Sequence, residues 1–238
     1  MADVIALGDA NIDIIAHFDA FPEKGGDGLA SRAEIHCGGS AANTALALAR
    51  LGVSTSLIAR LGPDSWALRL RSWLDEAGVG LSALQRDPAT MTGLMYVVVT
   101  PDGDRTILGY RGANVLTDPN QIHEEYVQGA KVFHLSGYAL LAEPQRSAAL
   151  LTMEMACRHG LIVTLDPGVS ISQAALDEMH ALLPVVNILL PNLDEAQKLT
   201  KMTAPEDCAQ ILLSKGCQAV ALKLGRDGCL VGNREGLR

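Results

Sequence analysis

Residues 37–45 read Cys-Gly-Gly-Ser-Ala-Ala-Asn-Thr-Ala, and the interpretation of the whole chain starts from this stretch. The pair Gly38 and Gly39 allows a backbone to approach a ligand closely at the start of a helix. The Ala-rich run 40–51 predicts that helix, and Asn43 falls in its first turn, where a buried amide needs a partner that a bound hydroxyl could supply. A Gly-rich turn with ordinary helix capping explains the same residues, so both interpretations stay open here.

Short apolar runs alternate with helical patterns around this stretch. Runs that begin about 30 residues apart match the size of a βαβ unit, and near-continuous apolar strands indicate a parallel sheet that is covered on both faces. The predicted strands are residues 4–7, 56–60, 132–135, 161–165, 185–190 and 219–224. The predicted helices are residues 40–51, 64–77, 143–159, 172–182, 193–200 and 205–215. We expect a single α/β domain over residues 1–238, with a mostly parallel central sheet flanked by helices.

Two segments break this α/β rhythm. Residues 11–36 carry no helical pattern, and residues 92–110 are typical of a hairpin, with an apolar strand on each side of an Asp102-Gly103 turn. We expect the two insertions to form a small β-sheet over one end of the main sheet. A lid of that kind commonly excludes water from a reaction.

The composition excludes several classes of protein. The chain has 238 residues with 19 basic and 27 acidic side chains, a net charge of −8, and no basic cluster, so a duplex nucleic-acid surface is not expected. The five cysteines lack C-x-x-C spacing, which disfavours a zinc ribbon or a disulfide framework. Reduced, buried thiols in a cytoplasm fit best. The chain has no basic leader and no run of 18 apolar residues, so neither a signal peptide nor a transmembrane helix is expected.

Three familiar motifs are absent. The chain contains neither a P-loop nor a G-x-G-x-x-G after the first strand. The nearest match to G-x-S-x-G lies at residues 38–42 and lacks the last Gly. A serine hydrolase that uses Ser40 is therefore disfavoured, because no Asp/His pair is identifiable either.

Asn11 and Asp13 form the first candidate polar pair. They stand two residues apart directly after the first strand, so in an extended segment they face the same side, and Ile12 faces the other. Two converging polar side chains can hold the hydroxyls of a polyol. A turn whose Asn and Asp side chains bond their own backbone explains the pair equally well.

Two further candidates follow the last predicted strands. Asn192 and Glu195 have the spacing of a capping box, and the carboxyl end of a strand also suits a role near Mg²⁺, its waters or phosphates. These two interpretations are compatible. The stretch from Lys223 through Gly225 to Gly228 follows a buried strand and is typical of a turn whose amides and lysine could meet a nucleotide.

Taken together and in this order, these motifs resemble the ribokinase (PfkB) family of carbohydrate kinases. The family's N-terminal signature has a Gly pair, an Asn four residues after the second Gly, a small residue two further on, and two spaced glycines. The matching residues are Gly38, Gly39, Asn43, Ala45, Gly52 and Gly62. The hairpin lid, the Arg111-Gly112-Ala113-Asn114 stretch and the 223–228 turn also fall where the family has them, so the resemblance covers essentially the whole chain.

The resemblance implies a ribokinase-like fold and transfer of the ATP γ-phosphoryl group to a hydroxymethyl group of a sugar or nucleoside. It assigns Asn11, Asp13, Gly38, Gly39 and Asn43 to substrate binding. It assigns Asn192, Glu195, Lys223, Gly225 and Gly228 to the nucleotide, with Glu195 near Mg²⁺ through water. It is also compatible with a homodimer that pairs through the lid.

One part of the family pattern is missing from these residues. The family carries a second signature, Asp-Thr-x-Gly-Ala-Gly-Asp, a few tens of residues after the 223–228 turn; its glycines form an anion hole and its last Asp is the catalytic base. The sequence ends at Arg238 before any such stretch. We therefore expect a C-terminally truncated kinase in which these 238 residues have little activity of their own.

Three hypotheses about the function stay open. A furanose-type sugar kinase leads, and a nucleoside kinase of the adenosine type is the nearest alternative. Nucleoside kinases need apolar or aromatic walls for the base, and only 4% of the residues are aromatic. A catalytically inactive sugar-binding or regulatory protein is the third possibility.

Overall fold

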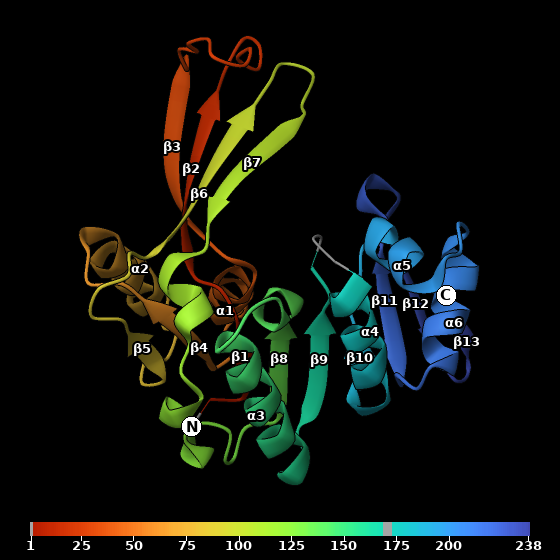
Figure 1. Ribbon diagram of the computed structural model, residues 1–238. Helices are drawn as coiled ribbons and strands as arrows, with labels where there is room; N and C mark the ends of the chain where they lie inside the picture. The colour runs from red at the N-terminus through yellow and green to blue at the C-terminus, as the bar shows by residue number, and fades with distance from the viewer. Residues whose placement is uncertain (1, 169–172) are drawn as a thin grey trace. The chain divides into compact units, whose positions relative to one another are not determined.

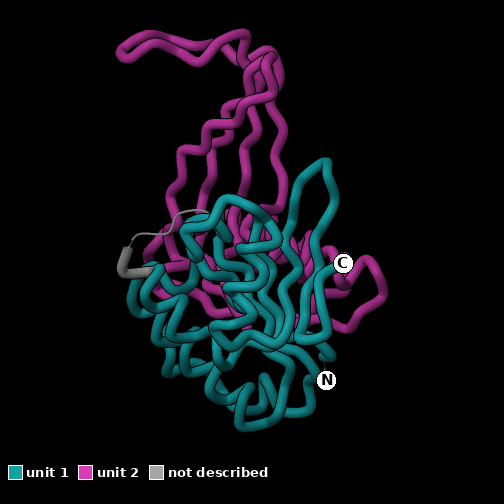
Figure 2. Tube along the Cα trace, turned by 90° about the vertical axis from the view of Figure 1, so that its right-hand side faces the viewer, with its two compact units in different colours: residues 1–7, 118–238 teal, residues 8–117 magenta. Residues whose placement is uncertain are grey.

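The computed structural model describes residues 2–168 and 173–238 (Figure 1). The chain forms two compact units, residues 1–7 with 118–238 and residues 8–117 (Figure 2). Each unit is described by itself below, and the single domain expected over residues 1–238 stays a prediction. We call the first unit 1 and the second unit 2.

Unit 1 contains a seven-stranded part of the main sheet, in the order β13-β12-β11-β10-β9-β8-β1. Neighbouring strands from β1 to β11 are parallel, whereas β12 and β13 run antiparallel to their neighbours. The strands are β1 (Val4–Leu7), β8 (Val132–Ser136), β9 (Ile162–Asp166), β10 (Ile188–Leu189), β11 (Ala219–Lys223), β12 (Cys229–Asn233) and β13 (Gly236–Leu237). The sequence analysis predicted β1, β8, β9, β10 and β11 but neither β12 nor β13.

Strands β1 and β8 of unit 1 are buried on both faces. Four consecutive residues of β8 and all four of β1 are buried, which requires cover above and below the sheet. Helix α3 packs on β8 and β9, and α6 packs on β11 and β12. The helices of this unit are α3 (Gln145–Arg158), α4 (Gln173–Leu182), α5 (Leu193–Thr200) and α6 (Pro205–Ser214).

One predicted strand of unit 1 is much shorter than expected. The prediction for residues 185–190 is wrong at both ends, because only Ile188–Leu189 pair with the neighbouring strands. A 3-10 turn at Leu183–Val185 occupies the start, since Pro184 lacks the amide that a ladder needs. Residue 172 of the predicted helix 172–182 lies outside the described residues.

Unit 2 holds two helices, a parallel strand pair and a separate small sheet. Strands β4 (Thr55–Leu61) and β5 (Leu84–Arg86) pair in parallel. Helix α1 spans Ser40–Arg50 and α2 spans Ser65–Glu76, and a 3-10 turn, η1, covers Gly112–Leu116. The Asp64 side chain caps α2 by accepting a hydrogen bond from the Ala67 amide at 2.9 Å.

The small sheet comes from the two predicted insertions. Its order is β3-β2-β6-β7, built from β2 (Asn11–His17), β3 (Arg32–Gly38), β6 (Gly93–Val99) and β7 (Arg105–Tyr110). Strands β2 and β6 are parallel and the outer pairs are antiparallel. Every residue of β7 is exposed, and the sheet's buried apolar cluster consists of Ala16, Phe18 and Val98. Figure 1 shows the four strands extending away from α1 and α2.

All five cysteines are free thiols. The expectation that they are buried holds for Cys208 and Cys217, whereas Cys37 is half-buried and Cys157 and Cys229 are exposed. No helix in the described part of the chain is both long enough and apolar enough to cross a membrane.

Candidate functional site

The glycine pair of unit 2 lies where two backbone segments meet. Gly39 precedes α1 with a φ of 89°, a conformation that side chains with a Cβ rarely adopt. A Cβ at this position would overlap the carbonyl group of Asp9. The same Asp9 carbonyl accepts a hydrogen bond from the Ala42 amide at 3.3 Å, so the start of the helix is held against the segment that leads into β2.

Asn11 and Asp13 lie beside this glycine pair in the structure. In the β2–β3 ladder Asn11 is opposite Gly38, and Asp13 is opposite His36. A Cβ on Gly38 would overlap the Asp13 carboxylate, so the missing side chain leaves room for that carboxylate. Both polar side chains thus lie on the side of the sheet where Gly38 and Gly93 have no Cβ.

The Asp13 carboxylate is the least satisfied polar group of this region. Its Oδ1 atom is buried and has no hydrogen-bond partner among the described residues. Burial raises the pKa of Asp13, although the nearby His36 acts in the opposite direction. A buried acceptor without a partner is rare in native structures, and a ligand hydroxyl is one group that would satisfy it.

A buried hydrogen-bond network supports this pair from behind. Arg111 donates two hydrogen bonds of 2.8 Å to the two oxygens of the Asp9 carboxylate. Asn114 accepts from the Ala10 amide at 2.9 Å and donates to Asn11 Oδ1 at 2.8 Å. The side-chain amide of Asn11 is therefore held against Asn114. This bond also connects the start of β2 to the turn that follows β7.

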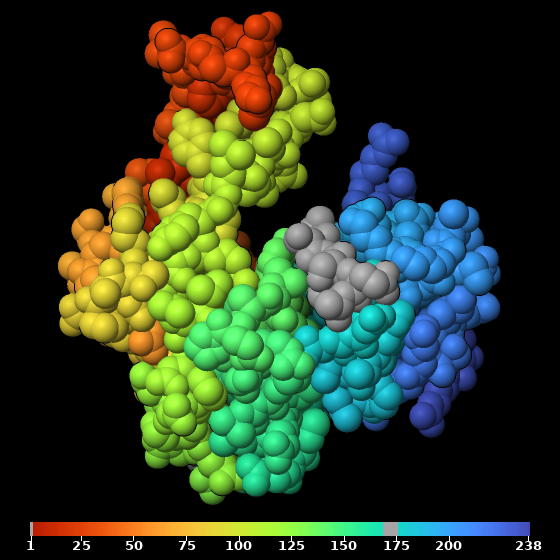
Figure 3. Space-filling view, viewed as in Figure 1, coloured from red at the N-terminus to blue at the C-terminus, as the bar shows by residue number. Residues whose placement is uncertain are grey.

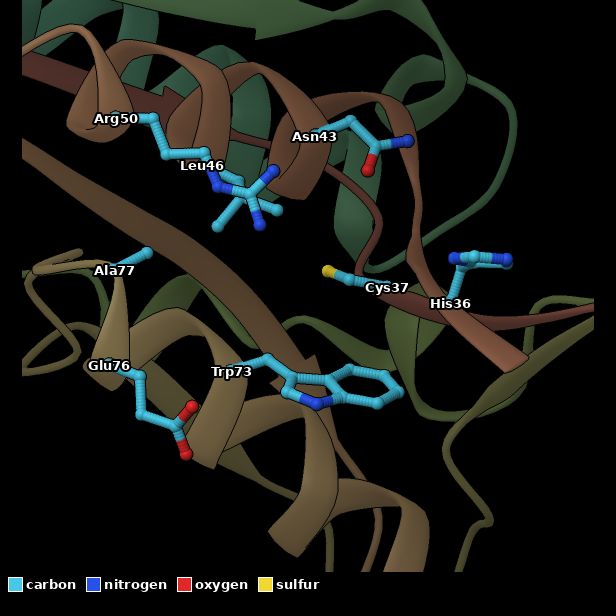
Figure 4. A pocket seen from close by; sticks show the side chains of 8 residues that line it. All are labelled: His36, Cys37, Asn43, Leu46, Arg50, Trp73, Glu76 and Ala77. Atoms are coloured by element: carbon cyan, nitrogen blue, oxygen red, sulfur yellow. The ribbon is translucent and has the colours of Figure 1, made fainter. Parts of the chain in front are cut away.

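Asn43 lines a cavity of about 650 Å³ in unit 2 (Figure 4). The close view shows side chains from α1, α2 and the end of β3 around one space. The lining residues are His36, Cys37, Asn43, Leu46, Arg50, Trp73, Glu76 and Ala77. Burial raises the pKa of the Cys37 thiol to about 11, and the charge of Asp13 adds to this, so the cavity presents a neutral thiol at pH 7.

The Asn192–Glu195 element of unit 1 forms a capping box at the start of α5. The Asn192 side chain accepts from the Glu195 amide at 2.9 Å, and the Glu195 carboxylate accepts from the Asn192 amide at 2.8 Å. Glu195 is only 2% exposed. Burial raises its pKa, and the nearby charge of Asp166 raises it further against the opposing hydrogen bond from Asn192. The capping function predicted for this spacing is therefore confirmed.

Lys223 lies next to this capping box but is not a free cation. Its ammonium group forms an ion pair of 3.0 Å with Asp166, the last residue of β9. Its backbone amide donates to Pro191 at 2.8 Å, and Lys223 forms a parallel bridge with Asn192. The predicted nucleotide elements of unit 1 are thus brought together at the carboxyl ends of its strands.

Gly225 and Gly228 close the turn after β11. Both have positive φ values, 64° and 92°, and no atom would meet a Cβ at either position within 4 Å. The turn is closed by a hydrogen bond of 2.9 Å from the Leu224 amide to the Gly228 carbonyl. The open space around these two residues leaves their backbone accessible to a ligand.

The described residues fit a magnesium ion only through its waters. No group of three or more His, Cys, Asp or Glu in residues 2–168 and 173–238 could hold a metal ion directly. Glu195 uses one oxygen in the capping box, and Asp166 is paired with Lys223. The two neighbouring carboxylates of Glu195 and Asp166 nevertheless offer oxygen acceptors to the hydration shell of a divalent cation.

Five contributors to these sites were missed or left without a role by the sequence prediction: Asp9, His36, Arg111, Asn114 and Asp166. Arg111 and Asn114 stood in a stretch that the family resemblance marked, but nothing in the sequence connected them to Asp9 and Asn11. His36 lies two residues before Gly38 in β3, and alternate residues of a strand share a face, but no individual strand was predicted over these residues.

The comparisons with known proteins agree with this arrangement. The family model of the pfkB family carbohydrate kinases matches residues 1–237. A probable fructokinase-4 from Arabidopsis thaliana is 28% identical over 200 residues, which cover 81% of this chain and 61% of that protein. The chain thus spans about three fifths of the length of the curated relatives it matches.

Two solved structures share the fold. The fructokinase of Halothermothrix orenii is 27% identical with a TM-score of 0.89, over 99% of this chain and 84% of the other. The Arabidopsis thaliana ribokinase complexed with ribose and ATP is 25% identical with a TM-score of 0.80, over 98% of this chain and 75% of the other. The chain belongs to the pfkB family of carbohydrate kinases, and its fold is ribokinase-like, as the sequence predicted.

The buried carboxylate of Asp13 makes a stability prediction. Because the pKa of Asp13 in the folded state lies above its ordinary value of 3.8, folding favours the neutral carboxyl group. That contribution to stability is fully present below pH 3.8 and is lost as the pH rises through the folded-state pKa. Asp13→Asn, which cannot ionise, should therefore have a higher Tm than the wild type at pH 7.

Thermal unfolding of both proteins between pH 4 and 8 measures this effect. The difference in Tm should shrink as the pH falls toward 3.8. A matched variant at an exposed carboxylate of the same insertion, Glu23→Gln, should show no such pH-dependent gain. An Asp13→Asn protein that is less stable than the wild type at pH 7 would contradict the prediction.

Proposed function

We propose that the protein, as a member of this family, transfers the γ-phosphoryl group of ATP to a hydroxymethyl group of a furanose-type sugar. The observation that carries the sugar-binding part is the buried Asp13 Oδ1 without a partner beside Asn11 and the glycine pair. A carboxylate that accepts a hydroxyl hydrogen forms a charge-assisted bond, stronger than one between neutral groups. Phosphoryl transfer depends mostly on such positioning.

Fructose is the sugar that we expect first. The fructokinase relative from Arabidopsis and the fructokinase structure from Halothermothrix support this choice, and the ribokinase structure keeps ribose as the second sugar. A nucleoside is favoured by a separate observation, because Trp73 lines the cavity that contains Asn43 and could form an aromatic wall for a base. A sugar-binding or regulatory protein without catalysis is the third candidate.

We propose ATP with Mg²⁺ as the phosphoryl donor, with the nucleotide at the carboxyl ends of the unit 1 strands. Lys223, Gly225 and Gly228 would line the nucleotide, and Asn192 and Glu195 would lie near its phosphates. The Mg²⁺ ion would neutralise phosphate charge, and Glu195 with Asp166 would hold its waters. The ribokinase complex with ATP supports the donor, and cytoplasmic location stays part of the proposal.

A second copy of this chain is the partner that we propose for the small sheet. Strand β7 forms one edge of that sheet, and every one of its residues is exposed, including Ile107, Leu108 and Tyr110. An unpaired edge with apolar side chains is a ready surface for pairing with another strand. Figure 3 shows this part of the molecule at the top of the space-filling view.

Calorimetric titration of the chain with fructose, ribose and adenosine tests the substrate proposal. We expect fructose to bind and Asp13→Ala to weaken binding by about 1.5–3 kcal/mol, the worth of a hydrogen bond to a charged group. Glu23→Ala, an exposed carboxylate of the same insertion, is the control and should bind normally. Binding of adenosine alone would overturn the sugar proposal. Added Mg·ATP in the same samples tests the expectation that these 238 residues have little turnover.

Substitution of Glu195 separates its capping function from the proposed role near Mg²⁺. Glu195→Gln keeps a side chain that can complete the capping box but removes a charge whose pKa burial already raises, so the Tm at pH 7 should not fall. Mg·ATP should bind about tenfold more weakly, or about 1.4 kcal/mol. Glu195→Ala should lose the cap as well, at about 1 kcal/mol of stability. Titration with Mg·ATP, and with ATP in a chelator, measures the difference. Unchanged Mg·ATP affinity in Glu195→Gln would leave Glu195 with capping alone.

Sedimentation of the chain tests the dimer. We expect the wild type to associate and Ile107→Lys to shift it toward the monomer, because a charge on an edge strand blocks pairing. Leu51→Lys, at a still more exposed apolar residue outside the sheet, is the control. A wild-type chain that sediments as a monomer at all concentrations would refute the proposal.

A further inference from the structure

The orientation of the Asn114 side chain is fixed by its backbone partners. The Ala10 amide can only donate, so the oxygen of Asn114 must face it, at 2.9 Å. The Asn114 Nδ2 group then faces the Arg111 carbonyl at 2.9 Å and the Asn11 side chain at 2.8 Å. Asn114 is completely buried, so water cannot replace these partners.

The orientation of Asn114 in turn fixes that of Asn11. Because Asn114 presents an NH₂ group, Asn11 must present its oxygen in return; a flipped Asn11 would place two donors against one another. Asn11 is only 3% exposed, so this conflict would be buried. Gly93, opposite Asn11 in the ladder, leaves room for the contact, because a Cβ there would overlap both Asn11 Oδ1 and Asn114 Nδ2.

The remaining group of Asn11 is a hydrogen-bond donor. The side-chain hydrogen bond of Asn11 to Asn114 uses its oxygen, so the Nδ2 group is left to donate to an acceptor on a ligand. Asp13, two residues along the same strand face, offers the opposite polarity, because its buried Oδ1 can only accept while the carboxyl group is ionised. The pair therefore has a direction: a donor at Asn11 and an acceptor at Asp13.

We propose that Asn114 is a positioning residue that sets this direction and thereby selects the substrate. The ligand that fits is a polyol that presents an oxygen acceptor to Asn11 and a hydroxyl that donates its proton to Asp13. The inference rests on the proposed sugar-binding function and adds to it that one hydroxyl is needed as a donor, whereas the other needs only to accept.

Monodeoxy and monodeoxyfluoro analogues of fructose test this polarity, because fluorine accepts a weak hydrogen bond and cannot donate one. At the hydroxyl opposite Asn11, the wild type should bind the fluoro analogue about twofold more tightly than the deoxy analogue, the low end of the range for a neutral hydrogen bond. At the hydroxyl opposite Asp13, both analogues should bind equally weakly, about tenfold or more below fructose.

Asn114→Asp should abolish the fluorine preference. Its carboxylate accepts at both oxygens, so Asn11 turns its NH₂ toward position 114 and its carbonyl toward the ligand. Asn11→Asp should lose the preference too, because it removes the donor without changing Asn114. Thr117→Val, which removes only a hydrogen bond of 2.8 Å to the Asn114 main chain, should keep it. Thermal unfolding monitors whether each variant is folded.

The outcomes are distinct. A fluorine preference that survives in Asn114→Asp would show that Asn114 has only a structural role, and one that survives in Asn11→Asp would show that Asn11 is not the donor; either overturns the inference. Equal binding of both analogues at every position by the wild type also overturns it. If the wild type binds none of fructose, ribose and adenosine, the proposed function itself fails, and this inference fails with it.

Discussion

Unit 2 depends on a buried hydrogen-bond network that joins segments about a hundred residues apart. The side chain of Asn114 bonds both the amide and the carbonyl of Ala10, 104 positions earlier in the chain. Arg111 donates two hydrogen bonds to the Asp9 carboxylate. Bidentate, charge-assisted pairs of this kind are among the strongest side-chain interactions. The carbonyl of Asp9 then receives the amide of Ala42 at the start of α1. The beginning of β2, the beginning of α1 and the turn after β7 are thus held in one geometry.

This network explains why small residues stand where they do. Gly39 and Gly93 occur at the positions where a side chain would collide with Asp9 or with the Asn11–Asn114 contact. In unit 1 the corresponding constraint is local. The Asn192–Glu195 capping box and the Lys223–Asp166 ion pair both lie at the carboxyl ends of neighbouring strands. That edge of the sheet is therefore held together by contacts between adjacent elements.

The sequence predicted the elements better than the connections between them. The apolar runs of β1 and β8 were found because both faces of these strands are buried, and those of β9 and β11 because most of their residues are apolar. The capping box was found because its two residues are three apart. Strand β10 was predicted too long because an apolar run does not show where pairing stops. The bonds from Arg111 to Asp9 and from Asn114 to Asn11 depend on tertiary folding across a hundred residues, which no local pattern records.

The small sheet has little interior of its own. Its apolar cluster is Ala16, Phe18 and Val98, with Tyr96 packed against it, whereas all of β7 is exposed. A segment with so few buried contacts opens locally at a small free-energy cost, compared with the buried strands of the main sheet. The binding free energy of any ligand held by Asn11 and Asp13 at the base of this sheet is therefore reduced by the conformational entropy lost when the sheet is ordered. Changes far out on β6 or β7, remote from every binding group, would then alter affinity through the entropy of the sheet.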